Sequence, residues 1–240
     1  MEICESGAIR FIEIGPVVDP DKCVLCGRCV EGCPTGAWEI IGRKTTVEEV
    51  MAEIRKDVVF YDESRGGATF SGGEPLMQPE FLLALLDACR TEEIHTAVDT
   101  SCYAKPEILR QVAERTNLFL CDIKHMNSEL HEQYTGIRND RILENIRMLA
   151  EAGKRIFVRV PIVPGFNSDR TNIEQTAQFI QSLRTVRRVD ILPYNRGGLE
   201  KAARLMGQVD LMEAQTPDDV TMDAIAGIFR GYGFEVKIGG

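Results

Sequence analysis

Hydrophobic and polar residues follow two different patterns along this chain, and the change falls near residue 43. Residues 1–42 are rich in glycine, proline and cysteine and show little of the spacing that marks a helix. Beyond them, short apolar runs typical of buried strands alternate with longer stretches whose apolar residues recur every three or four positions. We therefore expect two parts, one spanning residues 1–42 and the other residues 43–240.

The second part is predicted to alternate strands with helices. The expected strands cover residues 68–71, 94–99, 118–124, 156–162, 188–193 and 234–238. The expected helices begin after Thr46 and then cover residues 77–90, 105–115, 140–151, 171–184, 198–206 and 218–230. Thr46 and Glu49 match a capping box, and Gly153 suits the position just beyond a helix end. This alternation predicts an α/β fold with a parallel sheet or a (β/α) barrel.

Composition and charge narrow the class of protein. Of the 240 residues, 28 are Lys or Arg and 37 are Asp or Glu, so the net charge is −9. The basic surface expected of a nucleic-acid binder is missing. No apolar run approaches the ~20 residues of a membrane helix, and no signal peptide opens the sequence. We expect a cytoplasmic protein with neither a nucleic acid nor a membrane as its partner.

Half of the eight cysteines fall in one short run, Cys23-x2-Cys26-x2-Cys29-x3-Cys33. In a chain of cytosolic character, such clustering indicates metal binding rather than disulfides. Three thiolates at this spacing can hold three corners of an iron–sulfur cubane, and the run is typical of ferredoxins. Zinc is the alternative, although zinc sites usually combine two separated pairs of ligands.

A short internal repeat suggests the fourth ligand of the cluster. The sequence at 4–8, Cys-Glu-Ser-Gly-Ala, matches the sequence at 33–37, Cys-Pro-Thr-Gly-Ala. In two-cluster ferredoxins, the fourth cysteine of each run binds the other cluster. The predicted ligands of one complete 4Fe–4S cluster are therefore Cys4, Cys23, Cys26 and Cys29. Cys33 is assigned to a second cluster, whose other ligands are not in this sequence. The isolated cysteines are expected to be inert core residues, namely Cys89, Cys102 and Cys121.

Polar or glycine-rich sequence follows five successive predicted strands. Chemistry in (β/α) barrels takes place at the carboxyl ends of the strands, so these residues are expected to share one site. Both signs of charge, together with glycines that let a ligand approach the backbone, suit a small zwitterionic or polyhydroxylated ligand. No GxxxxGK[ST] sequence is present, which argues against a nucleoside triphosphate. The segments are Ser71-Gly72-Gly73-Glu74-Pro75, Asp99-Thr100-Ser101, Asp122-Ile123-Lys124, Arg159 and Tyr194-Asn195.

The sequence at 69–75, TFSGGEP, resembles the GGE motif of radical S-adenosylmethionine (SAM) enzymes. Other segments are similar to one subfamily, the glycyl radical enzyme activating enzymes related to the pyruvate formate-lyase activator, some of which carry a ferredoxin insert. These segments are DIKHM at 122–126, YTG at 134–136, VRVP at 158–161 and LPYN at 192–195. The resemblance covers essentially the whole chain.

The resemblance implies a partial (β/α)6 radical SAM-type barrel that lacks its first strand, preceded by a partial ferredoxin-like module. It implies that SAM and a 4Fe–4S cluster are the cofactors. A 5′-deoxyadenosyl radical made from SAM would take a hydrogen atom from a backbone glycine of a partner, the glycyl radical enzyme. A low-potential electron donor such as flavodoxin or ferredoxin would reduce the cluster.

The resemblance also implies roles for the residues at the strand ends. The residues implied to flank the methionine part of SAM are Gly72, Gly73 and Glu74. Those implied to lie near its carboxylate, where some members hold a monovalent cation, are Asp99, Thr100 and Asp122. Contacts to the carboxylate and the ribose are implied for Lys124 and Arg159. Many members carry histidine at the position of Asn195, the last residue of the implied set.

The main departure of the sequence from the family concerns the cysteines. The CxxxCxxC run that holds a cluster with one open iron is not present. It is expected upstream, with a first strand and half of the ferredoxin insert, about 60 residues if one βα unit is about 30. We therefore expect a truncated activating enzyme that is inactive alone. The alternative is an electron-transfer or scaffolding protein that kept a cluster and lost catalysis.

This expectation can be tested on the 240-residue chain. A cubane held by four cysteines has no free position at which iron could chelate SAM. The chain, reconstituted with iron and sulfide and given dithionite and SAM, should release no 5′-deoxyadenosine above background by liquid chromatography. A version extended upstream through a CxxxCxxC run should release it, whereas sustained release by the short chain would contradict the cluster assignment.

Overall fold

The computed structural model describes residues 4–13, 15–40, 42–195 and 214–239. It consists of two compact units, Met1–Thr45 and Thr46–Gly240. The predicted helix at 198–206 lies outside the described residues. Among those residues, no helix is both long enough and apolar enough to cross a membrane.

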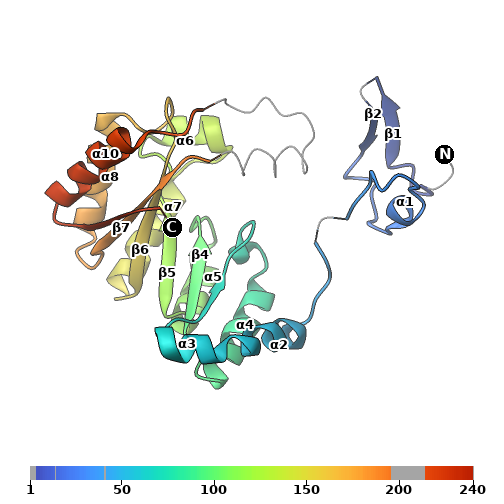
Figure 1. Ribbon diagram of the computed structural model, residues 1–240, viewed down its shortest axis with the longest axis horizontal. Coiled ribbons are helices and arrows are strands. Elements are labelled where there is room, and N and C mark those ends of the chain that lie inside the picture. Colours follow the sequence, from blue (N-terminus) through green and yellow to red (C-terminus); the bar gives the residue numbers. More distant parts are fainter. Residues whose placement is uncertain (1–3, 14, 41, 196–213, 240) are drawn as a thin grey trace. The chain divides into compact units, whose positions relative to one another are not determined.

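A six-stranded parallel sheet organises the second unit, with its strands in sequence order. The strands are β3 (Ala68–Phe70), β4 (Thr96–Thr100), β5 (Leu118–Asp122), β6 (Arg155–Ile162), β7 (Arg188–Pro193) and β8 (Glu235–Ile238). All six predicted strands are present, with ends that differ by no more than about two residues, as is usual for strand boundaries. The predicted α/β class with a parallel sheet is confirmed (Figure 1).

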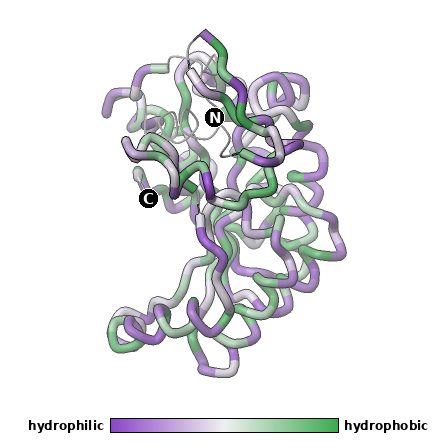
Figure 2. The backbone as a smooth tube through the Cα atoms, turned by 90° about the vertical axis from the view of Figure 1, so that its right-hand side faces the viewer, coloured by the Kyte–Doolittle hydropathy of each residue, from purple (hydrophilic) through white to green (hydrophobic). Residues whose placement is uncertain are grey.

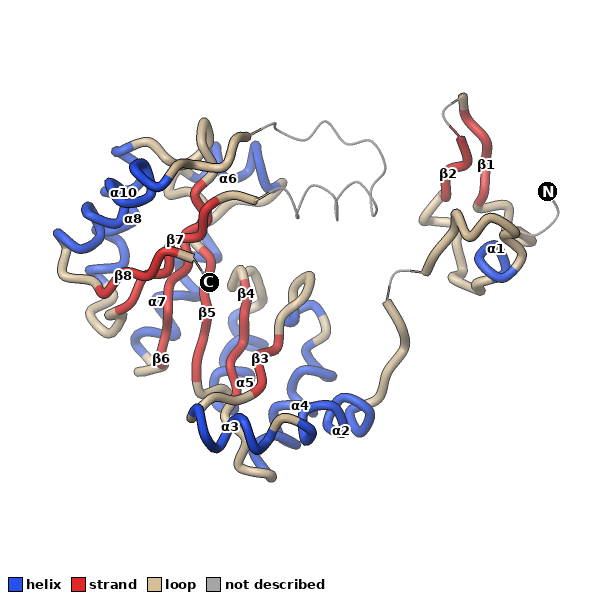
Figure 3. The backbone as a smooth tube through the Cα atoms, in the orientation of Figure 1, coloured by secondary structure: helices blue, strands red, loops and turns tan. Residues whose placement is uncertain are grey.

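Helices connect the strands and pack against the sheet (Figure 3). They are α2 (Val47–Lys56), α3 (Val58–Ser64), α4 (Pro79–Thr91), α5 (Pro106–Arg115), α6 (Ser128–Thr135), α7 (Asp140–Glu151), α8 (Arg170–Ser182) and α10 (Asp219–Gly231), with a 3-10 turn η1 (Pro75–Met77). The sequence pattern does not predict α3 and α6, because both are short and bury almost none of their side chains. In Figure 2 the helical coils alternate between hydrophobic and hydrophilic residues, as amphipathic helices do.

Two helix ends form as the sequence predicts. The Thr46 hydroxyl accepts a hydrogen bond from the Glu49 N–H, and the Glu49 carboxylate accepts one from the Thr46 N–H, so the capping box is complete. After α7, Gly153 has a φ of +69°. Its N–H donates to Ala150 and the next N–H donates to Leu149, which is the paired arrangement of a Schellman motif.

The two faces of the sheet differ in character. Along β6, every second residue from Ile156 to Ile162 is buried and belongs to the core shared with the helices. The residues between them lie on the opposite face, which we call the inner face. Strand register places four charged residues in one row across this face, namely Asp122, Arg159, Asp190 and Lys237.

The first unit is small and has little regular secondary structure. Its described residues form an antiparallel hairpin of β1 (Ile9–Ile12) and β2 (Gly15–Val18), and one short helix, α1 (Arg28–Glu31). The sequence pattern does not predict the hairpin, because its strands are short and bury none of their apolar residues fully.

The entry to β3 gives a test of the fold. A Cβ added at Gly67 would stand 1.9 Å from the His95 carbonyl oxygen, which also accepts the Ala68 N–H at 2.9 Å. Gly67→Ala must therefore break this hydrogen bond at the sheet edge, and we expect a loss of about 1–3 kcal/mol in the free energy of unfolding. Chemical denaturation measures it.

Gly227→Ala is the matched control for this substitution. Gly227 lies inside α10, and a Cβ there meets nothing within 4 Å. Alanine should raise the stability by up to about 1 kcal/mol, since glycine is a poor helix former. Equal shifts of the same sign in the two variants would contradict the packing described at Gly67.

Candidate functional site

Arg159 joins two carboxylates on the inner face. It lies on β6, next to Asp122 at the end of β5, while Asp99 lies on β4. The Arg159 Nε donates to Asp122 Oδ1 at 2.9 Å, and Nη1 donates to Asp99 Oδ2 at 2.9 Å. Nη2 also pairs with both carboxylates. One guanidinium therefore links three strands near their carboxyl ends, where the sequence predicts the site.

The three charged side chains are largely removed from solvent. Arg159, Asp99 and Asp122 keep 20%, 17% and 20% of their side-chain exposure. Burial raises the pKa of Asp122, although Arg159 and Lys124 pull it down in part. Burial also opposes the charge on Arg159, but Asp122 and Asp99 outweigh it, so the pKa of the guanidinium lies above its usual value. This cluster of side chains therefore contains two carboxylates and one guanidinium.

Glu74 ties the loop after β3 to the end of β4. Its Oε1 accepts from the Leu76 N–H at 3.1 Å and from the Thr100 hydroxyl at 2.7 Å. Its Oε2 accepts from the Ser101 N–H at 2.9 Å and the Ser101 hydroxyl at 2.6 Å. Four protein donors therefore engage this carboxylate, so Glu74 positions the two strand-end loops relative to each other.

The glycine-rich loop after β3 approaches the same cluster. The Ser71 hydroxyl donates to Asp99 Oδ2 at 2.9 Å. Gly72 has a φ of +131°, a conformation that favours glycine. A Cβ added at Gly72 or at Gly73 would meet nothing within 4 Å. The backbone here borders open space, so the loop leaves room for a ligand to approach closely.

Lys124 and Asn195 lie at the ends of β5 and β7. Among the described residues, no hydrogen bond joins the Lys124 amine to the cluster, but its charge lowers the pKa of Asp122. Asn195 is exposed, and the preceding Tyr194 holds to β6 through its N–H, which donates to Ile162 at 3.1 Å. The structure thus bonds Asp99, Asp122 and Arg159 directly and places Lys124 near Asp122.

Buried asparagines hold the loops of the site, and the sequence gives no sign of them. Asn167 donates to the Lys124 carbonyl at 2.7 Å and to the Pro161 carbonyl at 2.6 Å. Asn145 donates to the carbonyls of Cys102 and Ala104. The other two that bridge loop backbones in this region are Asn139 and Asn172. Most of their partners lie 13 to 46 residues away in the sequence, so no local spacing reveals these contacts.

A second charged pair on the inner face could have been found from the sequence. Asp190 stands between the buried residues Val189 and Ile191, and it is itself 5% exposed. Its carboxylate accepts from Arg188 Nε at 2.7 Å, and the Arg188 guanidinium lies over the Phe157 ring. A charged residue within an apolar strand is the signal, because a buried charge needs a partner.

The cysteine repeat of the first unit is also a structural repeat. Gly7 and Gly36 both have a φ of +64°. Their N–H groups donate to the carbonyls of Cys4 and Cys33 at 3.1 and 3.2 Å. Each thiol lies 3.4–3.5 Å from a hydroxyl two residues on, in Ser6 and Thr35 respectively. The two turns therefore present their thiols in the same way.

These turns favour thiolates, the form that binds iron. The Thr35 hydroxyl lowers the pKa of Cys33 to about 7, against the effect of burial and with help from backbone N–H groups. The Ser6 hydroxyl lowers the pKa of Cys4 in the same way. All five cysteines of this unit are free thiols, with Cys26 exposed. This donor set fits an iron–sulfur cluster, although no three His, Cys, Asp or Glu side chains of the described ranges surround a single metal-ion position.

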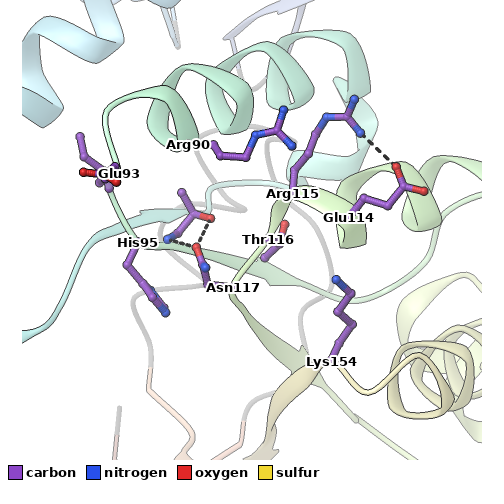
Figure 4. Close-up of a pocket in the computed structure, with 10 residues that line it drawn as sticks. Arg90, Glu93, His95, Glu114, Arg115, Thr116, Asn117 and Lys154 are labelled. Carbon is purple, nitrogen blue, oxygen red and sulfur yellow. Dashed lines mark hydrogen bonds and ion pairs between the residues drawn. The ribbon is translucent and has the colours of Figure 1, made fainter.

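A separate pocket of about 410 Å³ lies at the opposite, N-terminal edge of the sheet (Figure 4). His95, Arg115 and Lys154 line it, and Asn117 accepts hydrogen bonds from the Thr96 N–H and hydroxyl. None of the predicted site residues belongs to this pocket. Ligands of open parallel sheets bind at the carboxyl ends of the strands, so the inner-face cluster is the better candidate.

The fold and the glycine-rich strand end together define a radical SAM domain. The Radical SAM superfamily model matches residues 22–180. The trans-4-hydroxy-L-proline dehydratase activating enzyme of Clostridioides difficile is 37% identical over 100% of this chain and 80% of its own length. The isethionate sulfite-lyase activating enzyme of Desulfovibrio desulfuricans is 41% identical, over 89% of this chain and 71% of the relative.

A solved structure agrees with these relatives. A domain of a pyruvate-formate lyase-activating enzyme from Bacteroides vulgatus superposes with a TM-score of 0.62 at 36% identity, over 73% of this chain and 99% of that one. The chain belongs to the radical SAM superfamily, in its group of glycyl radical enzyme activating enzymes. The predicted membership is confirmed, and it favours this function over a non-catalytic electron-transfer protein. Members of the superfamily use a 4Fe–4S cluster and SAM.

Proposed function

We propose that the cluster of Asp99, Asp122 and Arg159 binds SAM, and that the protein uses it to activate a glycyl radical enzyme. The observation that carries the proposal is the Arg159 bridge beside the open backbone of Gly72 and Gly73. SAM carries an ammonium, a carboxylate and a sulfonium, and its net charge is positive. A half-buried site with an excess of carboxylates over cations complements that charge.

Each residue at the strand ends has a task in this proposal. Arg159 and Lys124 face the SAM carboxylate, while Asp99 and Asp122 face its ammonium and the ribose hydroxyls. Glu74 does not need to touch SAM, because its bonds to Thr100 and Ser101 hold the two loops at a fixed spacing. The remaining proposed contacts are Gly72, Gly73, Thr100 and Asn195.

The chain's own residues orient the ligand and exclude water from it. Charged groups in a half-buried site act more strongly than in water, since the effective dielectric constant is lower. The buried asparagines keep the loops from moving, and Asn167 fixes the backbone of Lys124. When bound beside a reduced cluster, SAM supplies the radical chemistry by which this family takes a hydrogen atom from a glycine.

We further propose that the first unit holds one 4Fe–4S cluster that passes electrons. Its ligands are Cys4, Cys23, Cys26 and Cys29. A low-potential carrier such as flavodoxin or ferredoxin donates the electron, and the setting is cytoplasmic, where thiols stay reduced. The matching turns at Cys4 and Cys33 support a two-fold ferredoxin arrangement, in which these two cysteines serve different clusters.

Titration calorimetry of the chain with SAM tests the proposed site. Binding should be weak without an iron that chelates SAM, and Asp122→Ala should weaken it by about tenfold or more, because a charged hydrogen bond contributes about 1.5–3 kcal/mol. Lys154→Ala, in the pocket at the other edge of the sheet, is the control and should leave the affinity unchanged. Tight binding that Asp122→Ala leaves unchanged and Lys154→Ala weakens would mean that SAM binds at the N-terminal edge of the sheet instead.

Iron analysis of reconstituted variants tests the cluster. Cys26→Ser should remove the iron, because it deletes a ligand of the complete cluster. Cys33→Ser should leave most of it in place. Equal loss from the two substitutions would show that Cys33 is a ligand and that the crossed arrangement is wrong.

A further inference from the structure

Two cysteines that are far apart in the sequence meet in the core of the second unit. The Sγ atoms of Cys102 and Cys121 lie 3.2 Å apart, closer than two sulfur atoms stand in ordinary contact. Both residues are fully buried. Each is a free thiol. The pattern of single cysteines predicts inert core residues, and both do lie in the core. Their meeting is visible only in the folded chain.

The pair sits directly behind the proposed SAM site. Cys121 precedes Asp122 on β5. Cys102 follows Ser101 in the turn after β4, and its N–H donates to the Thr100 hydroxyl at 2.9 Å. Ser101 in turn holds the carboxylate of Glu74. A covalent link between the two sulfurs would therefore join the turn that anchors Glu74 to the strand that carries Asp122.

The backbone at Cys102 is unusual. Its φ is +62°, in the left-handed region that glycine enters freely and that side chains with a Cβ rarely adopt. Asn145 holds this turn by donating to the Cys102 carbonyl at 2.8 Å. A cysteine kept in such a conformation, with its sulfur aimed at a second thiol, points to a use for the side chain beyond filling space.

We propose that Cys102 and Cys121 form a modification site, which a two-electron oxidant such as a peroxide or a diazene converts to a disulfide. Each thiol loses its proton and the pair loses two electrons as the S–S bond forms. A peroxide is reduced to two waters, and a diazene to a hydrazine. The sulfurs must approach by about 1.1 Å to reach disulfide length. The link pins the β4–α5 turn to β5.

Cys89 is a buried cysteine that has, among the described residues, no thiol beside it with which to form a disulfide. It is fully buried, and its thiol donates to the thioether of Met51 at 3.7 Å, which cannot form a disulfide. Burial raises the pKa of Cys89 to about 11. The hydrogen bond to Cys121 and burial also raise the pKa of Cys102. Of these two cysteines, Cys102 is the one that has a second thiol within reach, at 3.2 Å.

Peptide mapping of the full chain, reconstituted with its iron–sulfur cluster, tests the proposal. Diamide, a diazene, is added to the folded protein, and remaining thiols are then alkylated in denaturant before trypsin digestion. Cleavage after Arg and Lys, except before proline, places Cys89, Cys102 and Cys121 on separate peptides, 66–90, 91–110 and 116–124. We expect peptides 91–110 and 116–124 to be joined, lighter by two hydrogen atoms than their sum, and separated again by dithiothreitol. Peptide 66–90 should be recovered alkylated.

Two variants complete the test. Cys121→Ser should abolish the joined peptide and leave Cys102 alkylated, whereas Cys89→Ser should give the joined peptide in the same yield as the unchanged chain. The result for the unchanged chain does not depend on whether either variant folds. Recovery of Cys102 and Cys121 as separate alkylated peptides, or in disulfides with cysteines of the first unit, would overturn the proposal.

Discussion

The second unit depends on one half-buried arginine that holds two carboxylates from neighbouring strands. Without Arg159, Asp99 and Asp122 would place two like charges in a half-buried position, which the fold would tolerate poorly. With it, β4, β5 and β6 are joined at their carboxyl ends by charge-assisted hydrogen bonds. The contacts of the glycine-rich loop depend on this bridge. Ser71 donates to Asp99, and Glu74 accepts from Thr100, the residue after Asp99.

The same arrangement explains why the fold and the proposed SAM site involve the same residues. Strand register carries alternating charges across the inner face, from Asp122 to Lys237, while the opposite face is apolar and covered by helices. The sheet therefore has its apolar core on one face and its charged residues on the other. Oxidation of Cys102 and Cys121 would act at the boundary between the apolar core and the inner face, because Cys121 is a core residue next to Asp122.

Periodicity alone predicts most of the fold, since buried strands and amphipathic helices leave strong patterns and the capping signals at Thr46 and Gly153 are local. It also places the charged residues at the strand ends. It does not show which donors bind which carboxylates, so Glu74 is predicted as a ligand contact although four protein donors engage it. Asn145, Asn167 and the Cys102–Cys121 meeting also escape prediction, because each joins segments that are distant in sequence and close only in the folded chain.

The most direct measurement of the central claim is amide hydrogen exchange of the chain with and without saturating SAM. If SAM binds at the inner-face cluster, exchange should slow in the segments 71–76, 99–103 and 122–126, where the loops close on the ligand. The segments 93–96 and 114–117, which line the pocket at the N-terminal edge, should exchange as before. Slowed exchange at that edge with no change at the strand ends would contradict the account.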